Sequence, residues 1–109
     1  MIKIEHTILN HNELKTLPDR VELMSGAWFE VPQSDNGILL IIDAREGGDI
    51  TITAGDSVLA GADHVAYAYY GINVIALESG RYLHTKGDNK GKIFVRANGE
   101  AYGWVVELK

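Results

Sequence analysis

Four histidines are the residues of this chain best suited to hold a metal ion or to move a proton. They are His6, His11, His64 and His84, and no two of them show the H-x-H or H-E-x-x-H spacing that places two imidazoles on one metal. Asp63 precedes His64, but neighbours on a strand point to opposite faces, so the pair cannot form a base and its orienting carboxylate. We expect structural or surface roles for the histidines.

Other chemistries find equally little support. The chain has no cysteine, which excludes disulfides, thiolate metal sites and cysteine nucleophiles. It also lacks the nucleophile-elbow, phosphate-loop, dinucleotide-binding and EF-hand motifs. We therefore expect no catalytic residue, no metal, no cofactor and no enzymatic activity. One alternative is a calcium ion held by acidic loop residues that meet at one end of the fold, namely Asp43, Glu46, Asp49, Asp56 and Asp63.

Aromatic and basic residues are the candidates for a partner-binding surface. Tyrosines at 67, 69 and 70 lie beside Gly71 and could form a stacking platform for a sugar or a peptide, although tyrosines on strands more often half-bury their rings. Residues 81–96 hold five basic residues against Asp88 alone, in a chain whose net charge is -5. This contrast favours an acidic protein partner, which includes another copy of the chain, over nucleic acid. The candidate surface residues are Tyr67, Tyr69, Tyr70, Arg81, Lys86 and Lys90.

The elements that must position these residues show a period of two almost everywhere, which is typical of strands. A chain of 109 residues is the size of one domain, and no apolar run is long enough to span a membrane or to form a secretory signal. Short strands punctuated by Gly or Asn-Gly predict an all-β fold, an antiparallel β-sandwich or jelly roll. The expected strands cover residues 21–24, 28–31, 38–42, 49–53, 65–70, 72–78, 81–85, 92–97 and 100–108.

The carboxyl-terminal strands carry the most specific structural prediction. Asn98-Gly99 is typical of a two-residue type I′ turn, which predicts that 92–97 and 100–108 pair as an antiparallel hairpin. In that register Ile93 faces Trp104. The predicted core face then consists of Ile93, Val95, Tyr102, Trp104, Val106 and Leu108, while residues 105, 107 and 109 face away from the core.

The first seventeen residues allow two interpretations. Alternating isoleucines indicate a strand, and residues 12–17 could form one helical turn that is capped by Asn10 or Asn12 and stopped by Pro18. The segment is either an edge strand of the domain or an arm that pairs with a partner. We accordingly divide the chain into residues 1–17, an N-terminal arm or edge strand, and residues 18–109, the β-sandwich domain. If the segment is an arm, its binding residues are Ile2, Ile4, Ile8 and Leu9.

Residues 74–95 read V-I-A-L-E-S-G-R-Y-L-H-T-K-G-D-N-K-G-K-I-F-V. This segment resembles the carboxyl-terminal pattern of small bacteriophage virion proteins, in which a strand ends in L-x-S-G-[RK]-[FY] and a loop carries G-x-N-K-G-K. Upstream, I-T-I-T-A-G-D-S-V-L-A-G-A-D at 50–63 resembles the strand and loop that precede it in those proteins. The resemblance covers about residues 37–109 and leaves residues 1–35 unmatched.

The resemblance implies a non-enzymatic capsid decoration protein that binds and stabilises the assembled phage head. Its expected partners are the major capsid protein and further copies of itself, as a homo-oligomer or at symmetry-related sites, without nucleic acid or membrane. It would be made in the host cytoplasm and lie on the capsid surface of the virion. The alternatives are a carbohydrate-binding β-sandwich module, which would use the three tyrosines, and another phage head or tail accessory protein. A hydrolase using Asp63 and His64 is a third class.

Overall fold

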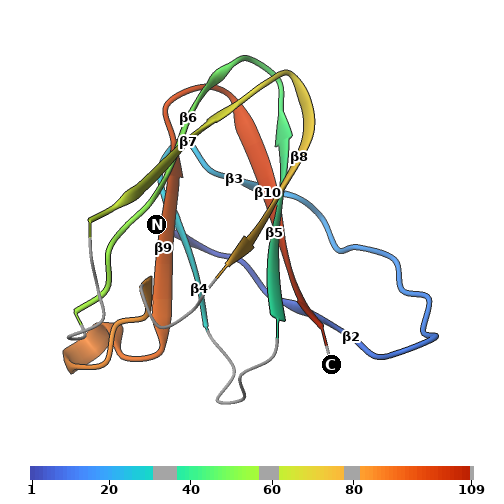
Figure 1. Cartoon of the computed structure of the whole chain (residues 1–109), viewed down its shortest axis with the longest axis horizontal. Helices are drawn as coiled ribbons and strands as arrows, with labels where there is room; N and C mark the ends of the chain where they lie inside the picture. Colours follow the sequence, from blue (N-terminus) through green and yellow to red (C-terminus); the bar gives the residue numbers. More distant parts are fainter. Residues whose placement is uncertain (31–36, 57–61, 78–81, 109) are drawn as a thin grey trace.

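Two β-sheets packed against each other form the molecule (Figure 1), which confirms the predicted all-β sandwich. The computed structural model describes residues 1–30, 37–56, 62–77 and 82–108. The strand order is β1-β4-β9-β6-β7 in the first sheet and β2-β10-β5-β8 in the second, with β3 also pairing with β10. The elements are β1 (Ile2–Lys3), β2 (Thr7–Leu9), β3 (Val21–Glu22), β4 (Ala27–Glu30), β5 (Gly37–Ala44), β6 (Gly48–Ile52), β7 (His64–Ala68), β8 (Gly71–Leu77), η1 (Gly87–Asn89), β9 (Lys92–Ala97) and β10 (Ala101–Leu108).

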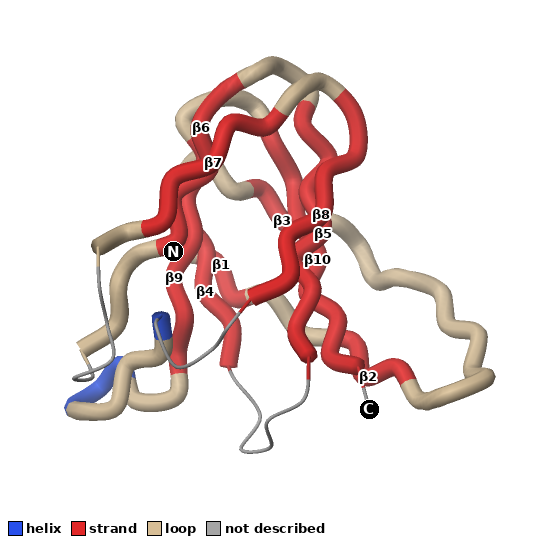
Figure 2. Tube along the Cα trace, viewed as in Figure 1, coloured by secondary structure: helices blue, strands red, loops and turns tan. Residues whose placement is uncertain are grey.

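Three of the short connections at which the chain changes sheet lie close together. These join β5 to β6, β7 to β8 and β9 to β10, and they lie at the same end of the molecule, at the top of Figures 1 and 2. Neighbouring strands pair antiparallel, except that β1 runs parallel to β4 and β2 runs parallel to β10. The two N-terminal strands therefore make the sheets mixed, which the prediction of an antiparallel sandwich did not include.

Alternating apolar side chains from both sheets fill the space between them. Ile50 and Ile52 point inward from β6, as the alternation predicted. In the second sheet β5 lies between β10 and β8 and buries Leu40 and Ile42 completely. Phe29 from β4 is the largest fully buried side chain. Because inward and outward residues alternate with a period of two, the register of these central strands is well specified.

The predicted hairpin at Asn98-Gly99 is wrong. Strand β9 pairs with β4 and β6 in the first sheet, whereas β10 pairs with β5 in the second, so the turn connects two sheets instead of two paired strands. The Asp49 N–H donates to Asn98 Oδ1 at 2.7 Å, and the Asn98 N–H donates to the Asp49 carbonyl at 3.1 Å. A Cβ on Gly48 would collide with Asn98 Oδ1, so a glycine is needed for this close approach.

The predicted core face of β10 is wrong by one residue. Alternate residues from Ala101 to Glu107 are buried on the core side, and Trp104 is half-buried on the outer side. Ile93 and Val95 are buried as predicted, and Val106 is buried too, although it lies on the outer side of β10. The Trp104 Nε1–H donates to the Pro18 carbonyl at 2.8 Å, so the segment before β3 covers part of the outer face. Both faces of β10 thus contact protein, which explains why large apolar residues occur on both.

Two smaller predictions also fail. Residues 82–85 form no strand, and residues 12–17 form no helical turn. The Glu13 N–H donates to the Asn10 carbonyl at 3.2 Å, and the Asn10 N–H donates to Glu13 Oε1 at 3.3 Å. This reciprocal pair closes a single turn around Asn12, whose φ is 59°. A helix so short lacks the hydrogen bonds that would offset the entropy of nucleation.

Candidate binding surface

Strands β7 and β8 form one flank of the sandwich, each at the edge of its own sheet. Among the described residues, β7 pairs with β6 only and β8 with β5 only, so each strand has a free edge. The Asn73 side-chain amide donates to the Tyr69 carbonyl at 2.8 Å and to the Gly71 carbonyl at 3.2 Å. Gly71 has a φ of 113°, which disfavours any other residue there. The turn between β7 and β8 is therefore fixed by its own hydrogen bonds.

This flank carries an exposed apolar surface. Its six large side chains are between 55% and 73% exposed, and residues 64–77 include no Asp, Glu, Lys or Arg. We call it the β7–β8 surface, and its members are Val65, Tyr67, Tyr69, Tyr70, Ile72 and Val74. Since single exposed apolar residues are common on soluble proteins, the informative feature is their concentration on two consecutive strands and the turn between them.

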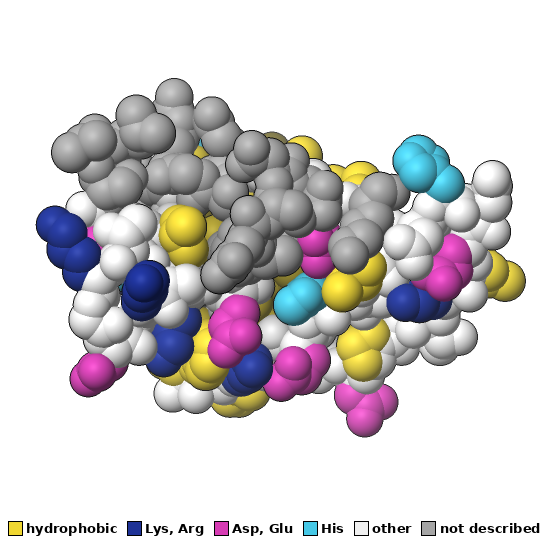
Figure 3. All heavy atoms as spheres, turned by 90° about the horizontal axis from the view of Figure 1, so that it is seen from below, with side chains coloured by type: hydrophobic (Ala, Val, Ile, Leu, Met, Phe, Trp, Pro, Cys, Tyr) yellow, Lys and Arg dark blue, Asp and Glu magenta, His cyan; other side chains and the backbone are white. Residues whose placement is uncertain are grey.

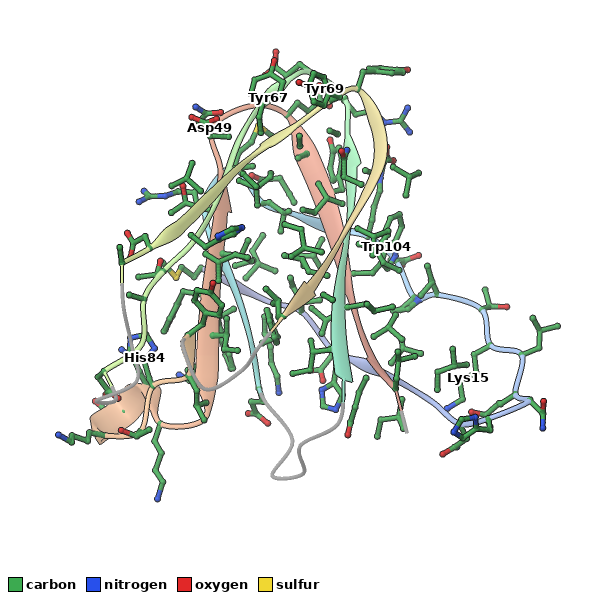
Figure 4. The ribbon with its side chains drawn as sticks, in the orientation of Figure 1. Lys15, Asp49, Tyr67, Tyr69, His84 and Trp104 are labelled. Atoms are coloured by element: carbon green, nitrogen blue, oxygen red, sulfur yellow. The ribbon has the colours of Figure 1, made fainter. Side chains whose placement is uncertain are left out.

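The predicted tyrosine cluster forms part of this surface. Tyr67 and Tyr69 lie beside each other at the end of the molecule where the chain changes sheet (Figure 4). Their ring centroids are 4.9 Å apart, and the ring planes meet at 67°. The Tyr67 hydroxyl lies against Gly47, where a Cβ would collide with it. The two rings thus pack edge to face and do not form the flat platform on which a sugar ring would stack.

A shallow pocket of about 160 Å³ opens between the two strands of this flank. Ile42 and Ile50, which belong to the core, contribute to its lining, so the interior of the sandwich is close to solvent here. The rest of the lining comes from β7 and β8, namely Ala66, Tyr67, Ala68, Asn73, Val74 and Ile75. Asn73 contributes an amide side chain to this lining and Tyr67 an aromatic ring.

The predicted basic residues occupy a different place. Lys86 and Lys90 flank η1 and are exposed, and Lys and Arg side chains gather at this end of the molecule in the view from below (Figure 3). In Figure 4 His84 lies near η1, far from Tyr67 and Tyr69, so the single surface that the sequence suggested is divided into two. Arg81 lies outside the described residues.

One carboxylate holds this basic loop in place. Asp56 Oδ1 accepts hydrogen bonds from the Thr85 hydroxyl and the Thr85 N–H, both at 2.7 Å, and Asp56 Oδ2 accepts one from the Lys86 N–H at 3.3 Å. The Thr85 hydroxyl, followed by its N–H, holds the pKa of Asp56 below its ordinary value of 3.8. We call residues 84–92 the basic loop.

The proposed arm residues lie within the sandwich. Ile4 is only 2% exposed and belongs to the core at the point where the chain crosses from β1 to β2. Ile8 and Leu9 are half-buried and pair with β10, and Ile2 is 44% exposed in β1. The first nine residues are thus placed as edge strands of both sheets, and Ile4 presents no surface to a partner.

The histidines and acidic loop residues are spread over the fold. His6 Nε2 lies 3.6 Å from Glu107 Oε2, and the His84 ring packs edge-on against Phe94. Asp43 accepts a hydrogen bond from Arg20 and also pairs with Arg45, while Glu46 accepts from the Glu100 N–H at 2.7 Å. Asp63 accepts from the Ala54 N–H at 2.7 Å. In the described ranges no three His, Asp or Glu residues come together as a metal site would require.

Val65, Ile72 and Val74 are surface residues that the sequence analysis did not single out. The alternation of residues predicts that each lies in a strand, but it does not predict which side of the strand faces solvent. The available signal was the uninterrupted lack of charge across residues 64–77, in a chain where charged residues make up 23%. A strand with one face in water ordinarily carries polar residues on that face. The lack of charged residues in both β7 and β8 therefore distinguishes this flank.

None of the helical segments in the described ranges has the length and apolar character needed to cross a membrane.

Comparisons with known proteins give no relative for this chain. No protein-family model matches the sequence, and neither a curated protein nor a solved structure shows significant similarity to it.

Proposed function

We propose that this chain is a structural protein of a bacteriophage virion, of the capsid decoration type, that acts by binding other proteins and catalyses no reaction. The observation that carries the proposal is the β7–β8 surface. Soluble monomers seldom expose a large contiguous apolar patch, and where they do it usually marks a site of protein association. The resemblance of residues 37–109 to small phage virion proteins names the kind of assembly.

Decoration stabilises a shell by mass action. A protein that binds the assembled lattice and not its free subunits shifts the equilibrium toward the lattice. The basic loop suits this attachment, because its exposed lysines project from a chain whose net charge is -5 and would be attracted to an acidic protein surface. Asp56 fixes the loop before binding, which lowers the entropy lost on attachment.

The test is co-sedimentation with shells from the phage that encodes the chain. The full-length protein should pellet with assembled shells, stay in solution with dissociated subunits, and raise the temperature at which the shells come apart. Lys86→Glu should weaken binding, most strongly at low salt, because it reverses a charge in the basic loop. Lys15→Glu is the matched control, since it changes the net charge equally on a segment away from the loop. Failure to bind shells, or equal binding to free subunits, would contradict the proposal.

A carbohydrate-binding module is the second candidate, and the three exposed tyrosines are what favours it. The edge-to-face packing of Tyr67 on Tyr69 argues against it, because a sugar ring stacks on a flat aromatic face. A glycan array separates the two functions. Saturable binding to one glycan class, lost in Tyr69→Ser and kept in Leu14→Ser, would favour the carbohydrate function over shell decoration.

A further inference from the structure

Within the part of the chain that the structure describes, the free edges of β7 and β8 lack the features by which soluble proteins usually protect sheet edges. Such edges are commonly kept from pairing by lysines, by proline, by a covering segment or by being very short. Strand β8 has seven residues and β7 has five, and neither contains a charged residue or a proline. Every second residue of an edge strand turns its N–H and C=O away from its neighbour in the sheet. The flank therefore combines unused backbone hydrogen-bonding groups with an apolar surface.

The size of the β7–β8 surface matches one side of a stable interface. Its three tyrosines, two valines and one isoleucine together expose roughly 700 Å². The largest apolar patch of a typical monomer covers about 300–600 Å². A standard interface buries about 800 Å² on each partner. If the surface were covered by a partner of similar shape, it would supply most of the area that such a complex requires.

The charge distribution allows a second copy of the chain to be the partner at this flank. The chain has a net charge of -5, so two copies repel each other over most of their surfaces. At the β7–β8 surface no charged residue of either copy would oppose another, because residues 64–77 contain none. An antiparallel strand pair has a twofold axis, so β8 can pair with β8 of a second copy through identical contacts. With the axis at the middle of the strand, Val74 faces Val74 of the partner, and Ile72 faces the partner's Ala76.

We propose that two copies of this chain associate through their β7–β8 surfaces, with the two β8 strands antiparallel about a twofold axis at Val74. The pairing joins the two second sheets into one continuous sheet and removes the free edge of β8 in each copy. The inference deepens the proposed function and rests on it in one respect, which is that the β7–β8 surface is a contact with protein.

Cysteine cross-linking tests the pairing and its register, because the natural chain has no cysteine. Residues that face each other across an antiparallel pair lie close enough for a disulfide. Val74→Cys should therefore form a covalent dimer rapidly under mild oxidation. Leu14→Cys is the control, because Leu14 is 97% exposed and lies outside the flank. Equal rates of cross-linking would show random collision and would overturn the proposed register.

Sedimentation equilibrium of the full-length chain measures the association itself. The unmodified protein should have the mass of two chains, and Val74→Lys should raise the dimer dissociation constant about a hundredfold, because it places two ammonium groups together at the axis. Leu14→Lys, at a 97% exposed position outside the flank, should leave the constant unchanged. Circular dichroism should show that each variant is folded.

A chain that stays monomeric at all concentrations overturns the inference. So does a dimer that Val74→Lys leaves intact. Neither result touches the proposed function, which is tested separately by binding to assembled shells. A dimer that fails to bind shells would conversely support the inference and contradict the decoration function.

Discussion

The two flanks of the sandwich differ in how far their edge strands are protected from pairing with other chains. On one flank the sheets end in β1 and β2, which have two and three residues, and on the other they end in β7 and β8, which have five and seven. At the N-terminal flank Lys3 forms ion pairs with Glu5 at 3.3 Å and Glu30 at 3.5 Å. Short, charged edge strands resist pairing with other chains, and long uncharged ones promote it. The contrast is what supports the proposed contact through the β7–β8 surface.

The N-terminal flank is also closed by the chain itself. Trp104 donates a hydrogen bond to the Pro18 carbonyl, and the Arg20 guanidinium lies 3.9 Å from the centre of the Tyr102 ring. Both contacts hold the segment before β3 against the outer face of β10. The opposite flank has no equivalent cover among the described residues. The measurements below test this contrast, beginning with the change expected to cost the most.

Ile4→Ala should lower the free energy of unfolding by about 2–5 kcal/mol, because it leaves a cavity where the chain crosses between the sheets. Chemical denaturation of the full-length protein measures the loss. A change below about 0.5 kcal/mol, the size usual for surface positions, would show that the first residues are a detachable arm and not part of the fold.

Trp104→Phe should cost at least about 0.5–1.5 kcal/mol, the net contribution of one hydrogen bond, because it removes the donor to Pro18 and also the contact area by which indole exceeds a phenyl ring. Denaturation together with proteolysis of residues 10–20 provides the measurement. Tyr102→Phe serves as the control, because it keeps its ring and removes only a hydroxyl that donates to the exposed Glu100 side chain. If Tyr102→Phe were cleaved faster than Trp104→Phe, the hydrogen bond from Trp104 would not be what holds the segment before β3 against β10.

The basic loop has a dependence on pH of its own, through Asp56. Asp56 has a lowered pKa in the folded chain, so its hydrogen bonds stabilise the loop at neutral pH and are lost as the pH falls through that lowered pKa. The Thr85 amide resonance should follow this titration in NMR spectra, and Asp56→Asn should abolish it. A Thr85 resonance that titrates unchanged in the variant would assign the effect to another group.

Ile72→Ala should have the smallest effect, within about 0.5 kcal/mol in the free energy of unfolding, when measured at a protein concentration low enough to keep the chain monomeric. Its side chain is 63% exposed and leaves no cavity. The same substitution costs several kcal/mol at Ile4, so this pair measures the contrast between the flanks directly. A loss above about 2 kcal/mol would show that Ile72 packs into the core.

The sequence predicted the class of fold because alternation is a local property. Ile50 and Ile52 face the core as expected, and the central strand at residues 38–42 is where the apolar run placed it. The failures lie where distant segments decide the outcome. Asn98-Gly99 has the composition of a hairpin turn, but the turn is bonded to Asp49, about fifty residues away, and leads into the other sheet. Turn chemistry fixes a local bend and not the sheet that the next strand joins.

The candidate surface was predicted in part. Tyr67, Tyr69 and Tyr70 are exposed, but the sequence could not separate them from the lysines of the basic loop, because their distance depends on the fold. The sequence also could not predict which side of β10 faces the core. Glu107 is buried and Trp104 is half-buried, the reverse of what hydrophobicity alone predicts, because residues far away in the chain cover the outer face.

The parallel pairing of β2 with β10 joins Thr7–Leu9 to Val106–Leu108, so the second strand of the described chain lies beside the last one. During synthesis on a ribosome, β2 must therefore wait for nearly the whole chain before it meets its partner. Pairings between such distant segments form slowly because the loop entropy is lost before the contacts form. Until β10 has been made, β5 can pair with β8 on one side, but its other edge has no partner. The nascent chain thus exposes one edge of β5 in addition to that of β8, and unpaired strand edges promote aggregation until folding is complete.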